Sequence, residues 1–182
     1  ALAAQKLLDF FAKEFPKEFK KIRFGSKEAG QNWQKQLESI GAPKRDVGNI
    51  SRGAYVLSEP ADTGQKKKAQ EVIIATGSEV QLALKAQELL AMNNIAVRVV
   101  SMPGTNTFDK QTTAYKQSVL PAGLPRIAVE MGVSDFWWKY GCAAVVGIDT
   151  YGESAPAPVL FKHFGFTPEN VAQTVQAVLA RK

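Results

Sequence analysis

The chain has 182 residues, which is long enough for one well-packed core and a small appendage. Its residues are 45% hydrophobic and 22% charged, a balance that excludes disordered and fibrous proteins. The formal net charge is +6, but lysine and arginine crowd the segment before residue 28 and form a run at 66–68, outside the apparent core, so we expect solvated surface and neither a nucleic-acid nor a membrane partner.

The first 37 residues are predicted to form a helical extension, which Pro16 and Gly25 interrupt. Lysines follow one side of it, and the apolar side contains Leu2, Leu7, Leu8, Phe10, Phe11, Phe15 and Phe19. Because an isolated amphipathic helix is marginal in water, we expect this segment to dock on the domain or on a second copy of the chain, so that its deletion promotes aggregation or dimerisation. We therefore expect a helical extension and linker at 1–50 and a domain at 51–182.

The stretch Glu71–Ser101 predicts a strand, a helix and a second strand. A β-branched run leads to the turn residue Gly77, and Ser78 with Gln81 matches the S-x-x-Q capping box that begins many helices. The two asparagines at 93–94 tolerate the left-handed conformation that ends a helix. Two apolar strands around one helix imply parallel pairing, so this stretch is a βαβ unit.

The other elements alternate in the same way. An edge strand is predicted at 55–57, a loop at 102–107, a helix at 109–118, a strand at 126–130, a helical turn at 135–140, a strand at 143–148, a helix at 155–164 capped by Ser154, and a last helix capped by Thr167. This alternation predicts an α/β fold, a three-layer αβα sandwich around a mostly parallel five-stranded sheet.

Two loops are candidates for binding an anion or another small ligand. Gly77 and Ser78 follow the first core strand, and Gly152, Glu153 and Ser154 follow the fourth, each before a predicted helix whose free amides could hold an anion. The glycines and serines are equally well explained as turn and cap residues, so a purely structural role stays open at both loops.

Residues for catalysis or metal binding do not form a recognisable pattern. Cys142 is the single cysteine, which excludes an intrachain disulfide and a cysteine zinc cluster, and no spacing pairs it with the single histidine, His163. The carboxylates that could gather at the strand ends are Glu79, Glu130, Asp135, Asp149 and Glu153. Each is interpreted as a cap, ion-pair or turn residue, so we predict no catalytic residue and no metal site.

The aromatic block Phe136, Trp137 and Trp138 has two interpretations. Such rings fill a core, but three in a row cannot all face one side of a helix, and exposed aromatic side chains mark contact surfaces. Both interpretations stay open at this point.

Five segments occur in the order of one known family. They are ATGSEV at 75–80, VRVVSMPGTNTFDKQ at 97–111, SVLP at 118–121, IAVE at 127–130 and YGESAPAPVLFKHFGFTPENV at 151–171. Together they resemble the C-terminal domain of transketolase, over about seven-tenths of the chain, 52–181. The words FFAKEFPKEFKKI and NWQKQL are similar to the helical linker that follows the first diphosphate-binding domain in that family, which would leave the middle domain missing near 40–52.

The resemblance implies part of an enzyme that uses thiamine diphosphate and Mg²⁺ to move a two-carbon ketol unit between phosphorylated sugars. In that family the cofactor site is built from two other domains, and its Gly-Asp-Gly and Asn-Asn signature is absent from this sequence. The resemblance therefore implies structural, dimer-contact or regulatory roles, no catalysis and no cofactor bound by this chain alone, and the remaining transketolase domains or a second copy as partners. It implies a cytoplasmic location, with the plastid stroma as the alternative.

Two other functions stay open beside this one. An autonomous module for a small metabolite or anion would use the loops at Gly77 and Gly152 and would be stabilised by its ligand. A pure protein-interaction domain would instead associate with itself as its concentration rises.

Overall fold

The structure is a computed structural model, and it describes residues 47–60 and 68–181. The extension and most of the linker predicted at 1–50 lie outside the described residues. Val47–Lys182 forms a compact unit of its own. No helix in the described ranges is both long and apolar enough to pass through a membrane.

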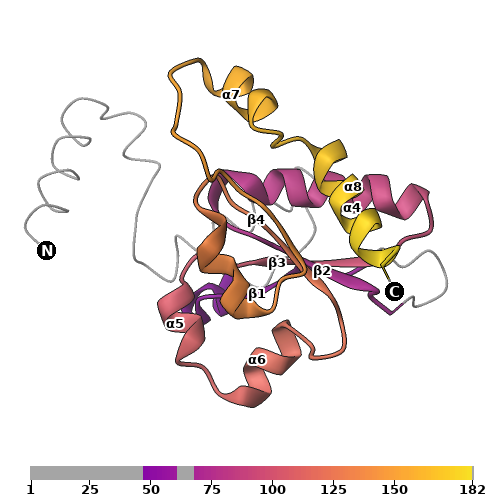
Figure 1. The fold of residues 1–182 in the computed structure, drawn as a ribbon. Coiled ribbons are helices and arrows are strands. Elements are labelled where there is room, and N and C mark those ends of the chain that lie inside the picture. The colour runs from indigo at the N-terminus through magenta and orange to yellow at the C-terminus, as the bar shows by residue number, and fades with distance from the viewer. Residues whose placement is uncertain (1–46, 61–67, 182) are drawn as a thin grey trace, which may run out of the picture. The chain divides into compact units, whose positions relative to one another are not determined.

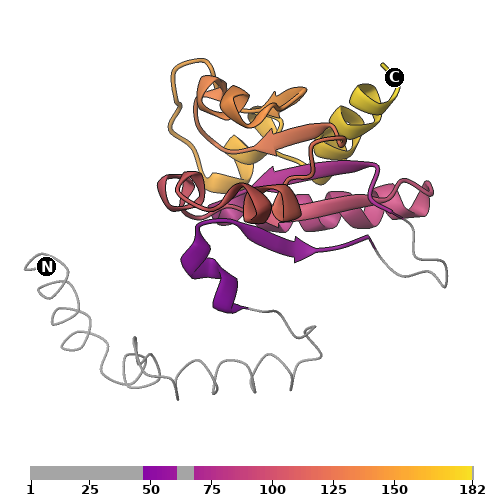
Figure 2. The same cartoon turned by 90° about the horizontal axis from the view of Figure 1, so that it is seen from below.

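The unit is built on one five-stranded sheet in the order β1-β3-β2-β4-β5. Its strands are β1 (Tyr55–Ser58), β2 (Glu71–Ala75), β3 (Val97–Ser101), β4 (Arg126–Val129) and β5 (Ala144–Val146). The pairs β2–β3, β2–β4 and β4–β5 are parallel, and β1 pairs antiparallel with β3 at one edge, as Figure 2 shows from the side of α5 and α6. The predicted mostly parallel sheet and the edge strand at 55–57 are therefore confirmed.

Helices cover both faces of the sheet (Figure 1). One face packs against α4 (Val80–Met92) and α8 (Pro168–Leu179), with α7 (Ala157–His163) before α8. The other face packs against α5 (Thr105–Asp109), α6 (Thr113–Val119) and the 3₁₀ helix η3 (Ser134–Tyr140), beside the 3₁₀ helix η1 (Val47–Arg52). All five residues of β2 are buried because the strand is covered on both faces, so the predicted three-layer α/β sandwich is confirmed.

The start of α4 differs from the prediction. Gly77, with φ of +55°, turns the chain directly into the 3₁₀ helix η2 (Gly77–Glu79), so Ser78 lies inside this turn and Glu79 takes the N-cap position. The Ser78 hydroxyl donates to Glu79 Oε1 at 3.1 Å and caps no backbone amide. The predicted capping box is therefore wrong. The predicted end of this helix at the two asparagines is confirmed, because Asn94 has the left-handed φ of +60°.

The cap predicted at Ser154 is also wrong. Helix α7 begins at Ala157 with Pro156 at its N-cap and no side-chain cap. Proline disfavours the helical conformation in the residue before it, so the chain stays extended through the predicted first turn. The cap predicted at Thr167 is confirmed, because its hydroxyl accepts from the Asn170 amide at 3.2 Å.

Two short helices replace the loop at 102–107 and the single helix predicted at 109–118. Helix α5 begins at Thr105, within the predicted loop, and ends at Asp109. Thr112 then adopts an extended backbone and accepts from the Tyr115 amide at 3.3 Å, which caps α6 as a separate helix. A good N-cap residue inside a predicted helix therefore marks a second helix start.

The aromatic block is divided between core and surface. Trp137 is 3% exposed and packs in the core, whereas Phe136 and Trp138 are 45% and 47% exposed. Both interpretations of this block thus hold, each for different rings.

Candidate functional site

The loops that follow β4 and β5 meet at the carboxyl edge of the sheet. The Ile148 amide donates to the Gly132 carbonyl at 2.8 Å, which holds the two loops side by side. A Cβ on Gly147 would lie 3.0 Å from the Gly132 carbonyl oxygen, so glycine lets the two loops approach this closely without displacing either backbone. In parallel sheets this edge is where ligands commonly bind.

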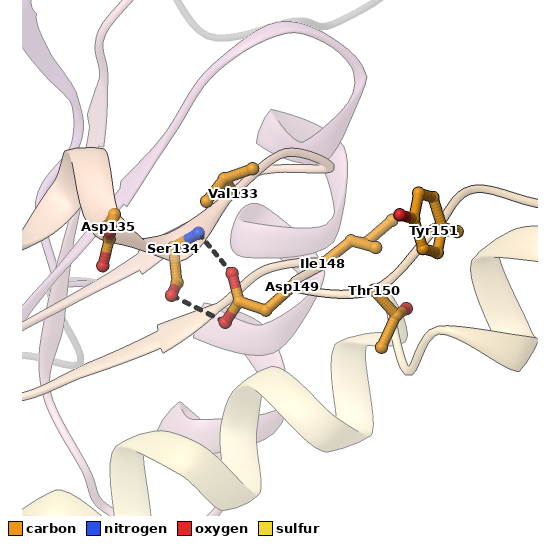
Figure 3. Close-up of a pocket in the computed structure, with 7 residues that line it drawn as sticks. All are labelled: Val133, Ser134, Asp135, Ile148, Asp149, Thr150 and Tyr151. Atoms are coloured by element: carbon orange, nitrogen blue, oxygen red, sulfur yellow. Dashed lines mark hydrogen bonds between the residues drawn. The ribbon is translucent and has the colours of Figure 1, made fainter.

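A hollow of about 550 Å³ opens between these loops. We call it the acidic hollow, and its lining residues are Val133, Ser134, Asp135, Ile148, Asp149, Thr150 and Tyr151. Figure 3 shows the Asp149 carboxylate bridging to the opposite loop, where it accepts from the Ser134 amide at 2.8 Å and from the Ser134 hydroxyl at 2.7 Å. Two hydrogen bonds therefore join the two loops that line the hollow.

The charge of the acidic hollow is negative. The amide and then the hydroxyl of Ser134 hold the pKa of Asp149 below its usual value, so this carboxylate stays ionised at neutral pH. Asp135 adds a second carboxylate, and none of the lining residues is basic. The arrangement can accept hydrogen bonds from hydroxyl or amino groups and repels phosphate.

The residues predicted for ligand binding do not line this hollow. Gly77 and Ser78 are exposed in the turn after β2, at another strand. Gly152, Glu153 and Ser154 are exposed in the segment that follows Tyr151, and Glu153 Oε1 lies 3.7 Å from His163 Nε2. These residues therefore have turn and surface positions outside the acidic hollow, and their role in ligand binding stays a prediction.

Asp135 and Asp149 were predicted to be able to gather at the strand ends, but each was interpreted as a cap, ion-pair or turn residue and not as part of one site. The signal that could have joined them is topological, because loops after neighbouring parallel strands share one edge. Applied to the strands at 126–130 and 143–148, this rule places the two loops side by side.

A second pair of carboxylates lies near the same edge. Glu79 is 4% exposed, and burial followed by the negative charge of Glu79 raises the pKa of Glu130. These two side chains follow β2 and β4, which are neighbours in the sheet. Glu79 and Glu130, two of the five carboxylates that could gather at the strand ends, therefore interact with each other. Within the described ranges no three or more acidic, histidine or cysteine side chains are grouped to hold a metal.

Cys142 and His163 do not form a nucleophile and base pair. Burial raises the pKa of Cys142 to about 11, with Arg126 acting in the opposite direction, so the protonated thiol dominates at neutral pH. His163 is exposed at the end of α7 beside Glu153. The described residues therefore contain no assembled catalytic group at either position.

Comparison with known proteins identifies the class to which this fold belongs. Residues 53–167, which include both loops of the acidic hollow, match the family model described as transketolase-like TK C-terminal domain. The chain is 45% identical over 149 residues to transketolase 1 of Pasteurella multocida, covering 80% of this chain and 22% of that protein. It is 51% identical over 137 residues to transketolase 1 of Vibrio cholerae, covering 74% of this chain and 20% of that protein.

Solved structures agree with this assignment. Transketolase from Leishmania mexicana superposes with a TM-score of 0.67 at 44% identity over 74% of this chain and 19% of that one. A Pichia stipitis transketolase, solved with xylulose 5-phosphate, gives a TM-score of 0.67 at 40% identity over 76% of this chain and 20% of that one.

The chain belongs to the transketolase family and contains its C-terminal domain. It spans about a fifth of the length of the curated relatives it matches.

Proposed function

We propose that this chain serves a transketolase as its C-terminal part and makes structural, dimer or regulatory contacts without performing the chemistry itself. The enzyme would transfer a two-carbon ketol unit between phosphorylated sugars, and the Pichia stipitis relative solved with xylulose 5-phosphate supports this substrate class. The remaining transketolase domains or a second copy of the chain would be its partners. A cytoplasmic location, with the plastid stroma as alternative, is part of the proposal and is checked by cell fractionation.

The observation that carries the contact role is the exposed apolar surface around η3. Val133, Phe136 and Trp138 are 62%, 45% and 47% exposed, and they come from one short segment. Large apolar side chains that are exposed within one short segment are typical of surfaces that a partner covers.

The residues at the carboxyl edge do not fit thiamine diphosphate. The diphosphate group is strongly anionic and is held through Mg²⁺ or by basic groups. The acidic hollow has no basic lining residue, and within the described ranges no three acidic, histidine or cysteine side chains are grouped to hold the metal. We therefore derive no catalytic step through this cofactor. In the full-length enzyme, thiamine diphosphate and Mg²⁺ would bind to other domains.

The test is reconstitution. Transketolase 1 of Pasteurella multocida would be truncated before the segment that this chain matches, and ketol transfer would be measured with and without the chain added. We expect the chain to restore activity to the truncated enzyme and to show none alone, and a Phe136→Ser and Trp138→Ser double variant to restore less. A matched control is Met92→Ser, which changes an exposed apolar residue at the end of α4.

Three outcomes would contradict the proposal. They are activity of the chain alone, full activity of the truncated enzyme without it, and calorimetric binding of thiamine diphosphate to the chain that is saturable, equimolar and dependent on Mg²⁺.

The exposed rings of Phe136 and Trp138 are also consistent with a second function, in which the chain acts only as a protein-interaction domain. Analytical ultracentrifugation over a concentration series separates the two. Self-association that the Phe136→Ser and Trp138→Ser variant abolishes would favour a second copy of the chain as the partner of this surface.

A further inference from the structure

A second hollow, of about 400 Å³, is lined by residues of α5, α6 and η3 and by Arg126 at the amino end of β4. Figure 1 shows α5 and α6 on one face of the sheet. We call this second hollow the basic hollow, and its lining residues are Phe108, Asp109, Thr113, Lys116, Gln117, Leu120, Ala122, Arg126, Lys139 and Tyr140. It shares no residue with the acidic hollow. Its volume falls in the range of small-molecule sites.

Positive charge dominates this lining. Lys116, Arg126 and Lys139 carry three positive charges, and Asp109 carries the one negative charge among the lining residues. Two positive charges are therefore left in excess inside one concave surface, which raises the local concentration of anions.

Asp109 is already engaged by one of the three cations. Its Oδ2 accepts from Lys139 Nζ at 2.9 Å, and its Oδ1 accepts from the Tyr140 hydroxyl at 2.9 Å. The hydrogen bond from Lys139 is the main reason that the pKa of Asp109 lies below its usual value. The charge of Lys116 also lowers this pKa, but the carboxylate forms its ion pair with Lys139, so among the lining residues no carboxylate is left to pair with Lys116 or Arg126.

Arg126 is a partly buried cation held by neutral groups. Its Nη1 donates to the Tyr140 carbonyl at 2.6 Å, and its Nη2 donates to the Leu120 and Pro121 carbonyls at 3.0 Å. Burial lowers the pKa of Arg126, and no carboxylate contributes to the shift. These carbonyls fix the guanidinium but do not neutralise it, so its field acts on whatever enters the hollow.

Lys116 and its neighbours supply donors that a ligand can use. Lys116 Nζ donates to the Asp109 carbonyl at 3.2 Å, and an ammonium has three donors, so this bond uses only one. Thr113, one turn before Lys116, and Gln117, the next residue of the same helix, add a hydroxyl and an amide to the lining. Phe108 and Leu120 give the hollow an apolar wall.

We propose that the basic hollow binds a phosphate group, either free phosphate or the monoester of a small polyol. A phosphate carries close to two negative charges at neutral pH and several acceptor oxygens, which match the two excess positive charges and the donors of Lys116, Thr113 and Gln117. A monocarboxylate would compensate only one of these charges.

The test is a titration of the full chain followed by NMR and calorimetry, with inorganic phosphate, glycerol 3-phosphate and glycerol as probes. We expect saturable shifts at Thr113, Lys116 and Lys139 with both phosphates, weaker binding at higher ionic strength, and none with glycerol. Tighter binding of glycerol 3-phosphate than of phosphate would identify the monoester as the ligand class, and the reverse would identify the free anion.

Two variants that should change phosphate affinity in opposite directions distinguish loss of the binding site from loss of the folded structure. Lys116→Gln should weaken phosphate binding about tenfold, whereas Asp109→Asn should tighten it, because the competing carboxylate is gone. Lys162→Gln, an exposed lysine on α7, is the control and should bind as the unmodified chain does. Absence of saturable shifts, unchanged binding by Lys116→Gln, or equal loss in Asp109→Asn and Lys116→Gln would overturn the proposal.

Discussion

The acidic and basic hollows lie at opposite ends of the same sheet and are built by opposite means. In the acidic hollow a carboxylate, Asp149, holds the backbone amide and hydroxyl of Ser134. In the basic hollow a guanidinium, Arg126, holds three backbone carbonyls. The end of the sheet that the fold class favours for ligands is therefore the one whose charge repels phosphate, so the side chains and not the fold decide which ligand each end accepts.

The largest expected effect comes from removing the cation that holds the basic hollow together. Arg126→Met keeps most of the apolar stem but leaves the Leu120, Pro121 and Tyr140 carbonyls without this donor, so we expect a loss of about 2–4 kcal/mol in the free energy of unfolding. Urea denaturation followed by tryptophan fluorescence measures it. Lys162→Met is the control and should change stability by less than about 0.5 kcal/mol. Equal stability of both variants would show that the hydrogen bonds of the guanidinium to the three carbonyls do not stabilise the fold.

The close approach of the two loops of the acidic hollow can be tested at Gly147. A Cβ there would lie 3.0 Å from the Gly132 carbonyl oxygen and 3.4 Å from Ser134 Cα, so Gly147→Ala should cost about 1–3 kcal/mol. Gly152→Ala is the matched control, because a Cβ there meets nothing within 4 Å. Thermal unfolding of both variants checks this, and a Gly147→Ala protein as stable as the control would contradict the observed packing.

Two carboxylates near the carboxyl edge should respond to pH in opposite directions. The pKa of Asp149 is lowered by Ser134, so its contribution to stability is present above its unfolded pKa and is lost as pH falls through the lower folded value. The pKa of Glu130 is raised by burial and by Glu79, so its contribution is present below its unfolded pKa and is lost as pH rises through the folded value.

The measurement is the free energy of unfolding from pH 3 to pH 7. We expect Asp149→Asn to be destabilised at pH 7 and to approach the unmodified chain at acidic pH. Glu130→Gln should instead gain stability relative to the unmodified chain as pH rises. Parallel curves for either variant and the unmodified chain would show that the corresponding group does not titrate as its surroundings imply.

The smallest effect is expected at Ser78, whose hydroxyl meets the Glu79 side chain and caps no helix. Ser78→Ala should change the free energy of unfolding by less than about 0.5 kcal/mol, whereas Thr167→Ala removes an observed cap and should cost about 1 kcal/mol. Chemical denaturation of the two variants provides the comparison. If Ser78→Ala lowered the free energy of unfolding as much as Thr167→Ala, the measurement would support the predicted capping box and contradict the observed geometry.

Most of the fold could be predicted from the sequence because its signals are local. The buried run at 71–75, the asparagines at 93–94 and the Thr167-Pro168 pair each determine their own strand, stop or cap within a few residues. Their alternation is enough to predict the parallel sheet and its two helical layers, and the ordered segments at 75–171 are enough to predict the transketolase family.

The failures at Ser78 and Ser154 occurred where a local signal competed with backbone geometry. Gly77 began a 3₁₀ turn early, and Pro156 kept the chain extended, so neither serine reached a cap position. The sequence shows which residues could cap a helix, but the path of the backbone selects one of them.

The side-chain arrangement of both hollows was decided by the tertiary structure, although the order of the strands already brings the two loops of the acidic hollow to one edge. Ser134 and Asp149 are 15 residues apart, and Asp109 and Lys139 are 30 apart, so no periodicity or motif connects them. Their charges combine only when neighbouring strands or packed helices bring the loops together. The net charge of each hollow therefore depends on residues from several separate segments of the sequence. The sequence by itself therefore determined the fold class and the family of this protein, while the packing of distant segments decided where a ligand could be held and of which charge.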